Sequence, residues 1–172
     1  PRKLPSIVAN AEDFTWQGRR FGRLEASIAR DPRGLRFVKL DTRSDAFALQ
    51  ASGSWFVEPT GSRTRLALEF ESEDLAAASR AFGYRDAVEA ERARLKADVG
   101  WSGGPDADAL ARMDGVVRLD LGRGQLRSVK PGASRILGLT SLIELPRRLS
   151  LDFRDVTDEG LAFDNVTGDF EL

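Results

Sequence analysis

The side chains best suited to chemistry are acidic residues near the end of the chain. Asp152, Asp155, Asp158 and Glu159 lie close together in the stretch DFRDVTDEG, and clustered carboxylates are typical ligands of a calcium ion. Their spacing does not match that of a calcium-binding loop, and carboxylates beside a glycine turn usually face solvent. We therefore expect no metal ion and no other cofactor at this stretch.

Two further patterns suggest catalysis or nucleotide binding, and both have plainer explanations. Gly122-Arg123-Gly124 lacks the third glycine and the following helix of a phosphate-binding loop, so it predicts a turn. Acidic residues are frequent enough to supply the paired carboxylates of a glycosidase, but their alternation along strands explains them as solvent-facing side chains.

Composition excludes several classes of function. The chain contains no cysteine and no histidine, which removes disulfides, thiolate zinc sites, catalytic thiols and imidazole bases together. Its 26 basic and 27 acidic residues are interspersed and give a formal charge of -1, so no basic stripe invites nucleic acid. The sequence predicts a protein that is not an enzyme and does not bind nucleic acid.

No segment has the character of a membrane span or a targeting signal. The longest apolar runs fall short of the roughly 18 residues that a membrane-spanning helix needs, and no signal peptide is present. The chain opens on Pro1 without a methionine and ends within a pattern at Leu172. We expect it to be one domain, residues 1–172, cut from a longer protein.

The dominant pattern along the chain is strict alternation of apolar and polar residues, which is typical of strands with one dry face. Asp31-Pro32-Arg33-Gly34 predicts the turn of a hairpin, and Pro59-Thr60-Gly61 predicts a second turn. The sequence therefore indicates a mostly β fold, a curved antiparallel sheet. The alternating apolar residues are Leu24, Ala26, Ile28, Leu35, Phe37, Phe47, Leu49, Ala51, Gly53, Trp55, Leu66, Leu68, Phe70, Ala93, Leu95, Ala97, Val99, Trp101, Val117, Leu119, Leu121, Leu149, Leu151 and Phe153.

Local departures from the alternation carry their own predictions. The pattern slips by one residue between Phe37 and Val38 and again between Phe163 and Val166. Because a slip would turn every later side chain to the other face, we expect a bulge or a bend at each place. Trp16, Trp55 and Trp101 lie on predicted strands, where aromatic side chains usually pack into the core.

Two segments have helical spacing. Residues 72–83 predict a short amphipathic helix with Ser72 as its cap, an inward face of Leu75, Ala78 and Phe82, and an end at Gly83. Residues 131–145 predict a second helix, whose apolar side is formed by Ile136, Leu139, Leu142, Ile143 and Leu145. At about 1.5 Å per residue this second helix is roughly 20 Å long, too short for a bilayer core of about 30 Å. We expect it to cover the dry face of the sheet.

The dry face itself has two explanations that periodicity cannot separate. It is either an ordinary core closed by the helices, or the lining of an open groove for apolar molecules. Alternating strands can extend such a groove to any length, because each added strand continues the same face.

Several stretches resemble one family of cell-envelope proteins. Gly132-Ala133-Ser134-Arg135-Ile136-Leu137-Gly138-Leu139, Leu145-Pro146-Arg147-Arg148-Leu149 and Leu151-Asp152-Phe153-Arg154-Asp155-Val156 are similar to a signature of the AsmA-like proteins, in particular their YhdP branch. Gly160-Leu161-Ala162-Phe163-Asp164, Asp13-Phe14-Thr15-Trp16-Gln17-Gly18, Ala51-Ser52-Gly53-Ser54-Trp55 and the stretch from Glu73 to Tyr84 add to the likeness, which covers nearly the whole chain. Thr140 and Thr157 depart from it, since larger apolar residues are expected there.

The resemblance implies a fold, a function and a location. Proteins of this kind are tethered in the inner membrane and cross the periplasm, and a β-sheet curled into an apolar trough is thought to carry phospholipids toward the outer membrane. It implies phospholipid acyl chains as the partner, the periplasm as the location, and neither catalytic residues nor a cofactor. The expected groove lining is Leu66, Leu68, Phe70, Leu95, Ala97, Val99, Val117, Leu119, Leu121, Leu149, Leu151 and Phe153, with Ile136, Leu139, Leu142 and Ile143 on the helix that covers the groove.

Two other classes of protein remain open at this point. One is a closed structural domain whose apolar face is fully buried and binds no lipid. The other is a protein-binding module whose sheet edges pair with strands of a partner.

Overall fold

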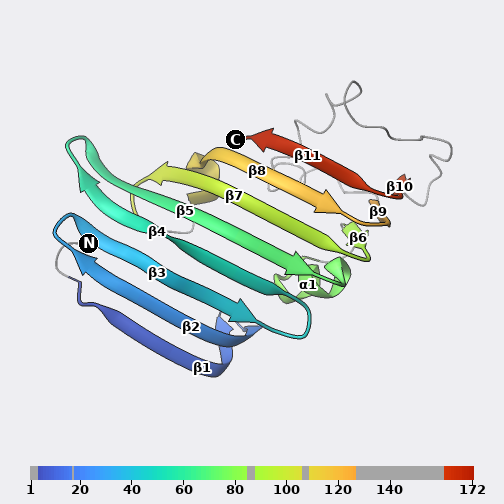
Figure 1. Cartoon of the computed structure of the whole chain (residues 1–172), viewed down its shortest axis with the longest axis horizontal. Coiled ribbons are helices and arrows are strands. Elements are labelled where there is room, and N and C mark those ends of the chain that lie inside the picture. Colours follow the sequence, from blue (N-terminus) through green and yellow to red (C-terminus); the bar gives the residue numbers. More distant parts are fainter. Residues whose placement is uncertain (1–3, 17, 85–87, 106–108, 127–160) are drawn as a thin grey trace.

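The computed structural model describes residues 4–16, 18–84, 88–105, 109–126 and 161–172, which form two antiparallel sheets and one short α-helix (Figure 1). The strands are β1 (Ile7–Trp16), β2 (Arg19–Asp31), β3 (Gly34–Arg43), β4 (Ala48–Glu58), β5 (Gly61–Ser72), β6 (Val88–Ala90), β7 (Ala93–Ser102), β8 (Asp114–Leu121), β9 (Gly124–Leu126), β10 (Leu161–Phe163) and β11 (Val166–Glu171). The helices are α1 (Leu75–Ala81) and the 3-10 turn η1 (Ala109–Arg112).

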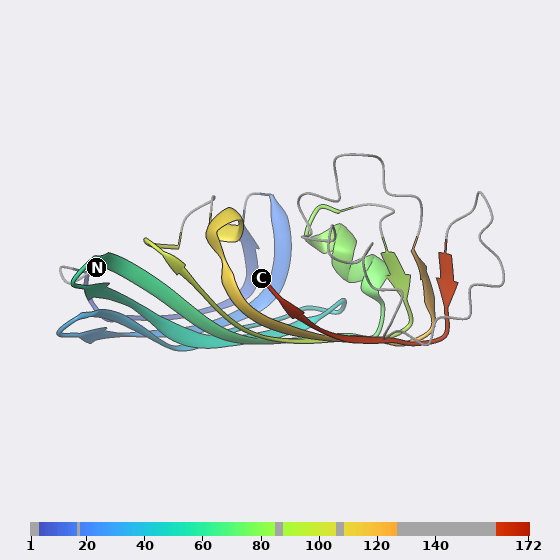
Figure 2. The same cartoon turned by 90° about the horizontal axis from the view of Figure 1, so that it is seen from above.

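The large sheet has eight strands in the order β1-β2-β3-β4-β5-β7-β8-β11, and every pair is antiparallel. It is open at both edges, and it bends so that α1, η1 and the small sheet all stand on one side of it (Figure 2). The predicted mostly β, antiparallel architecture is therefore confirmed. The small sheet, in the order β10-β9-β6, was not expected from the sequence.

Turn chemistry joins the first strands as the sequence predicts. The carboxylate of Asp31 accepts a hydrogen bond from the backbone N–H of Arg33 and so closes the turn between β2 and β3. This bond is the main reason why the pKa of Asp31 lies below its ordinary value. An aspartate at this place thus fixes the hairpin.

The two slips in the pattern have different structural causes. Between β3 and β4 the pairing jumps from Phe37 to Leu40, and Val38, the residue next to Phe37, points outward with 53% of its surface exposed. This is the expected bulge. At the second slip β10 ends at Phe163 and β11 begins at Val166, in the other sheet. Here the chain changes sheets, so the bend separates two sheets instead of distorting one strand.

The helix predicted at residues 72–83 is confirmed in place but not in its cap. The side chain of Asp74 accepts a hydrogen bond from the backbone N–H of Ala77, so Asp74 is the N-cap. Ser72 instead ends β5, and its hydroxyl donates to the carbonyl of Ala46 while accepting from the N–H of Asp74. Gly83 follows the last turn with a φ of 81°, which favours glycine.

The prediction that the tryptophans on strands pack into the core holds for only some of them. Trp101 is 3% exposed and packs in the core, whereas Trp16 on the edge strand β1 is 60% exposed, so the prediction for Trp16 is wrong. An edge strand has a neighbour on one side only, which leaves large side chains without packing partners. The predicted helix at residues 131–145 and the predicted strand residues Leu149, Leu151 and Phe153 lie outside the described residues.

Candidate functional site: the apolar face of the sheet

Strand register places the predicted groove residues in transverse rows on one face of the large sheet. Residues that face each other across antiparallel strands point to the same side, so each row crosses the sheet at right angles to the strands. The row through Leu68 contains Ala26, Leu40, Ala51, Leu68, Ala97, Val117 and Phe170, and the row through Leu66 contains Ile28, Phe37, Gly53, Leu66, Val99 and Gly115. We call these two the middle rows.

The other described members of the predicted lining lie in neighbouring rows of the same face. Phe70, Leu95 and Leu119 face one another on β5, β7 and β8, and Leu121 pairs with Ala93 one row further along. The structure therefore brings all the described predicted residues to one face.

Burial along this face is uneven. Ala97 and Val99 are each 6% exposed and Leu121 is 7% exposed, whereas Leu66 and Leu68 are only half-buried. Half-burial continues toward β2 and β3, at Ala26, Ile28, Leu40, Leu49 and Ala51. In the described part of the chain, the middle rows thus combine half-buried residues with the buried Phe37, Ala97 and Val99.

Tryptophan side chains close one end. The indole N–H of Trp101 donates to the carbonyl of Gly104 at 2.7 Å, and the hydroxyl of Thr64 donates to the carbonyl of Gly103 at 2.8 Å. A methyl group on Gly104 would lie 2.7 Å from the indole of Trp55, so only glycine lets this loop approach so closely. Ala109 of η1 packs on Trp101 and Val99. We call this region the tryptophan end.

Phenylalanine side chains close the opposite end, beneath α1. Phe82, at the C-cap of α1, lies with its ring 4.9 Å from that of Phe47, 5.6 Å from Phe21 and 6.1 Å from Phe70. Phe14 on β1 extends the group through Phe21 at 6.0 Å. We call these residues, Phe14, Phe21, Phe47, Phe70 and Phe82, the aromatic wall. Behind it, Leu121 packs with Ala90, Ala93 and the small sheet.

The opposite face of the same strands is charged and its charges are paired across strands. Glu69 faces Lys96 at 3.0 Å, and Arg118 faces Asp169 at 2.8 Å. Hydrogen bonding to Asp169 raises the pKa of Arg118. In the same way hydrogen bonding to Lys39 lowers the pKa of Glu25. Paired exposed charges keep this face in water.

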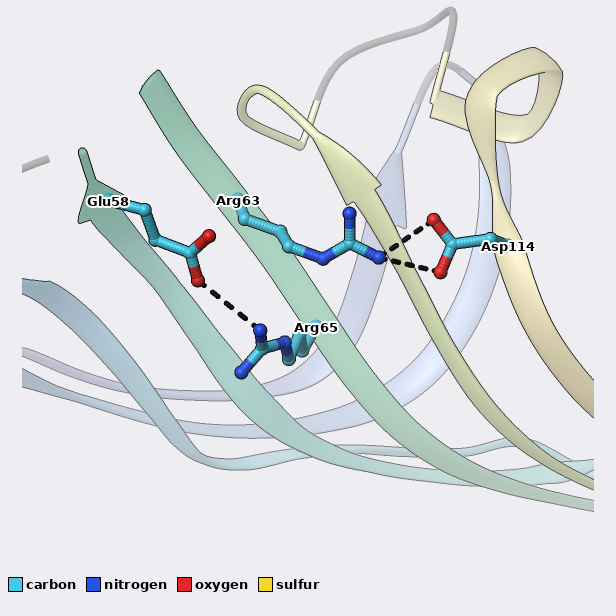
Figure 3. Close-up of polar contacts among 4 residues, drawn as sticks. All are labelled: Glu58, Arg63, Arg65 and Asp114. Atoms are coloured by element: carbon cyan, nitrogen blue, oxygen red, sulfur yellow. Dashed lines mark hydrogen bonds and ion pairs between the residues drawn. The ribbon is translucent and has the colours of Figure 1, made fainter. Parts of the chain in front are cut away.

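One ion pair spans a whole strand. Arg63 on β5 extends over β7 to Asp114 on β8, with its Nη2 2.6 and 2.7 Å from the two carboxylate oxygens, while Arg65 points the other way to Glu58 at 3.3 Å (Figure 3). The guanidinium passes close to Gly100 of β7, where a methyl group would lie 3.1 Å from Nη2 of Arg63, so a larger residue there would have to displace the arginine slightly.

Hollows on the charged face are bordered in part by charged side chains. One of about 400 Å³ is bordered by Arg63, Arg65, Asp98 and Asp114, and a neighbouring one of about 380 Å³ by Lys39, Asp41, Glu69 and Lys96. Among the residues that the structure describes, no three acidic side chains gather into a group able to hold a metal ion. The acidic stretch from Asp152 to Glu159 lies outside the described residues.

The aromatic wall and the tryptophan end could not be foreseen from periodicity. Phe82 was expected on the inward face of its helix, but its contact with Phe21 joins segments about 60 residues apart. Periodicity assigns a side chain to a face and carries no information on which distant ring meets it there. The glycine pair before Pro105 was the available signal for the close approach to Trp55.

These features define a class: an open, antiparallel β-sheet domain with one continuous apolar face and one face of paired charges. Over residues 1–172 the chain matches the family model described as YhdP protein. It is 30% identical over 168 residues to the "Intermembrane phospholipid transporter YhdP" of Escherichia coli (strain K12), an alignment that covers 96% of this chain and 13% of that relative's length. The chain therefore belongs to the YhdP family, and it spans about an eighth of the curated relative it matches.

No solved structure matches the chain. No helix of the described residues is both long and apolar enough to cross a membrane.

Proposed function

We propose that this chain forms a segment of a β-sheet conduit that moves phospholipids between the inner and outer membranes, as the periplasmic part of a longer protein. The observation that carries the proposal is the continuity of the middle rows, which contain no polar or charged residue from β2 to β8. Membership in the YhdP family, with a relative that is by name an intermembrane phospholipid transporter, supports the same function.

The mechanism follows from the chemistry of acyl chains. An acyl chain has no hydrogen-bonding groups, so it gains from apolar contact and needs no polar anchor. Many equivalent weak contacts, such as those of Ala51, Leu68 and Val117, allow it to slide because no single position holds it. In this mechanism the predicted lining residues contact the acyl chains, and no residue has a catalytic role.

A second candidate, a protein-binding domain of the envelope, has one observation in its favour. Edge strand β1 exposes Val8 to 77% and Ile7 to 43%, and it has a free backbone edge on which a partner strand can pair. In this case the apolar face would not contact lipid.

Adjacent valines on β8 provide a matched test. Val117 lies in a middle row, whereas Val116 lies on the charged face and is 44% exposed. A photo-crosslinking side chain placed at either position in the full-length protein in cells differs only in the face it samples. We expect phospholipid adducts at position 117 and few at position 116. Equal labelling would indicate general membrane contact, and no labelling at 117 would favour the protein-binding candidate.

A further inference from the structure

Helix α1 reaches across the apolar face instead of lying beside it. It follows β5 in the chain, yet Phe82 at its C-terminal end contacts Phe21 of β2, and β3 and β4 separate β5 from β2 in the sheet. The guanidinium group of Arg19 also packs against Gly83, where a methyl group would lie 2.6 Å from it. Figure 2 shows α1 on the same side of the sheet as η1.

The space between α1 and the sheet is filled. Ala78 of α1 is 1% exposed, and Phe47, whose ring contacts that of Phe82, is 3% exposed. Interiors packed to this degree have a density of about 0.75, which leaves no room for an acyl chain. Lipid therefore has no room next to Ala78 and Phe47 while α1 is seated. The other rings of the aromatic wall, Phe14, Phe21, Phe70 and Phe82, are half-buried.

The tryptophan end is closed in a comparable way. Trp101 is 3% and Thr64 is 0% exposed beneath Gly103 and Gly104. Between the two ends run the middle rows, in which Leu66 and Leu68 of β5 stay half-buried. Leu66 lies two positions along β5 from Thr64, and Leu68 lies two positions from Phe70. Each of these intervals is about 7 Å of extended strand.

We propose that α1, held by Phe82, is a side wall that confines acyl chains to the middle rows of the apolar face, with the tryptophan end as the opposite wall. The inference rests on the proposed lipid-conduit function and divides the predicted lining. The half-buried Leu66, Leu68 and Val117 line the floor of the path and pack on the buried Ala97 and Val99, whereas Phe70, Leu119 and Leu121 pack into the wall. Phe82 is a positioning residue: it sets the width of the path by keeping lipid away from Phe47.

Photo-crosslinking in the full-length protein in cells tests the wall. A probe at Leu68 samples the floor and a probe at Phe47 samples the space beneath α1. With α1 seated, we expect phospholipid adducts at 68 and at least tenfold fewer at 47. Phe82→Ala should raise the adducts at 47 severalfold and leave those at 68 unchanged, because it removes the ring that fills the space.

Phe56→Ala is the matched control. It removes the same atoms from the charged face, where the Phe56 ring lies under Arg33 at 4.2 Å, and it should change neither signal. Phe82→Leu keeps part of the apolar volume and should give an intermediate number of phospholipid adducts at 47. This variant replaces Phe82→Ala in the test if the alanine variant is not present at normal levels.

The outcomes separate the two proposals. Adducts at 68 together with equal adducts at 47 in the protein with intact Phe82 would overturn the wall and leave the conduit standing. Adducts at 47 that do not respond to either substitution of Phe82 would overturn the role of Phe82. An absence of phospholipid adducts at both 68 and 117 would overturn the conduit itself.

Discussion

Leu68 and Glu69 are neighbours on β5, yet they belong to two different surfaces. The row through Leu68 is apolar on every strand, whereas the row through Glu69 contains Glu25, Asp41, Gln50, Glu69, Lys96, Arg118 and Asp169. Both rows run over the same backbone and the same hydrogen bonds. The difference therefore comes from side-chain type alone, and it shows that one alternating pattern can specify an apolar surface and a charged surface at once.

The two faces also differ in how much each residue contributes to stability. On the charged face ion pairs are exposed and individually weak. On the apolar face small residues have little free space around them: Ala97 is 6% exposed, and a methyl group on Gly53 would collide with the backbone of β5. Substitutions of adjacent residues on the two faces should therefore differ sharply in their effects.

The largest difference is expected between Ala97 and Asp98. Ala97→Asp places a carboxylate at a position that is 6% exposed, among Leu68, Val99 and Val117, and should lower the free energy of unfolding by roughly 2–5 kcal/mol. Asp98→Ala on the exposed face should change it by less than about 0.5 kcal/mol. Urea unfolding of the purified chain measures both. Equal effects would show that the rows of this strand are not divided between a dry and a wet side.

An intermediate difference is expected between Gly53 and Ser52. A methyl group on Gly53 would lie 2.0 Å from the carbonyl oxygen of Arg65, so the strands must move apart, and Gly53→Ala should cost roughly 1–3 kcal/mol. Ser52→Ala, on the charged face, should cost within about 0.5 kcal/mol. Thermal unfolding of the two variants tests the contrast. A neutral Gly53→Ala would mean that β4 and β5 have more freedom to separate than the structure shows.

The smallest effect concerns the ion pair between Glu69 and Lys96. A double-mutant cycle with alanine at each position should give a coupling energy of about 0.2–1 kcal/mol, because both side chains are more than half exposed. The coupling should decline in about 1 M salt, where the screening length is about 3 Å. A coupling that is large and insensitive to salt would indicate that another part of the full-length protein covers this face.

Alternation in the sequence was sufficient to predict β2 to β5, β7 and β8 of the large sheet, because a period of two is a local property that each of these strands carries in its own residues. The turn at Asp31 and the bulge at Val38 were predictable for the same reason. The face to which Leu95 and Leu119 belong also followed from this period.

The parts that escaped prediction depend on distant partners. The strands of the small sheet are only three residues long, so Val88–Ala90 and Gly124–Leu126 carry too little pattern to be recognised. The cap of α1 shifted from Ser72 to Asp74 because Ser72 is engaged by Ala46, a residue from another part of the chain. The likeness to the YhdP family, which the sequence motifs suggested, is now shown over residues 1–172.

The bridge from Arg63 to Asp114 has a mechanical consequence. A strand pulled away from an antiparallel sheet along its edge breaks its hydrogen bonds one after another, which requires little force. The side chain of Arg63 on β5 crosses β7 and binds Asp114 on β8. Gly100, which has no side chain, leaves room for the arginine to cross β7. Separation of β8 from β7 at this end therefore also requires the ion pair between β8 and β5 to break. The loss of this ion pair and the loss of the backbone hydrogen bonds between β7 and β8 are thus coupled events.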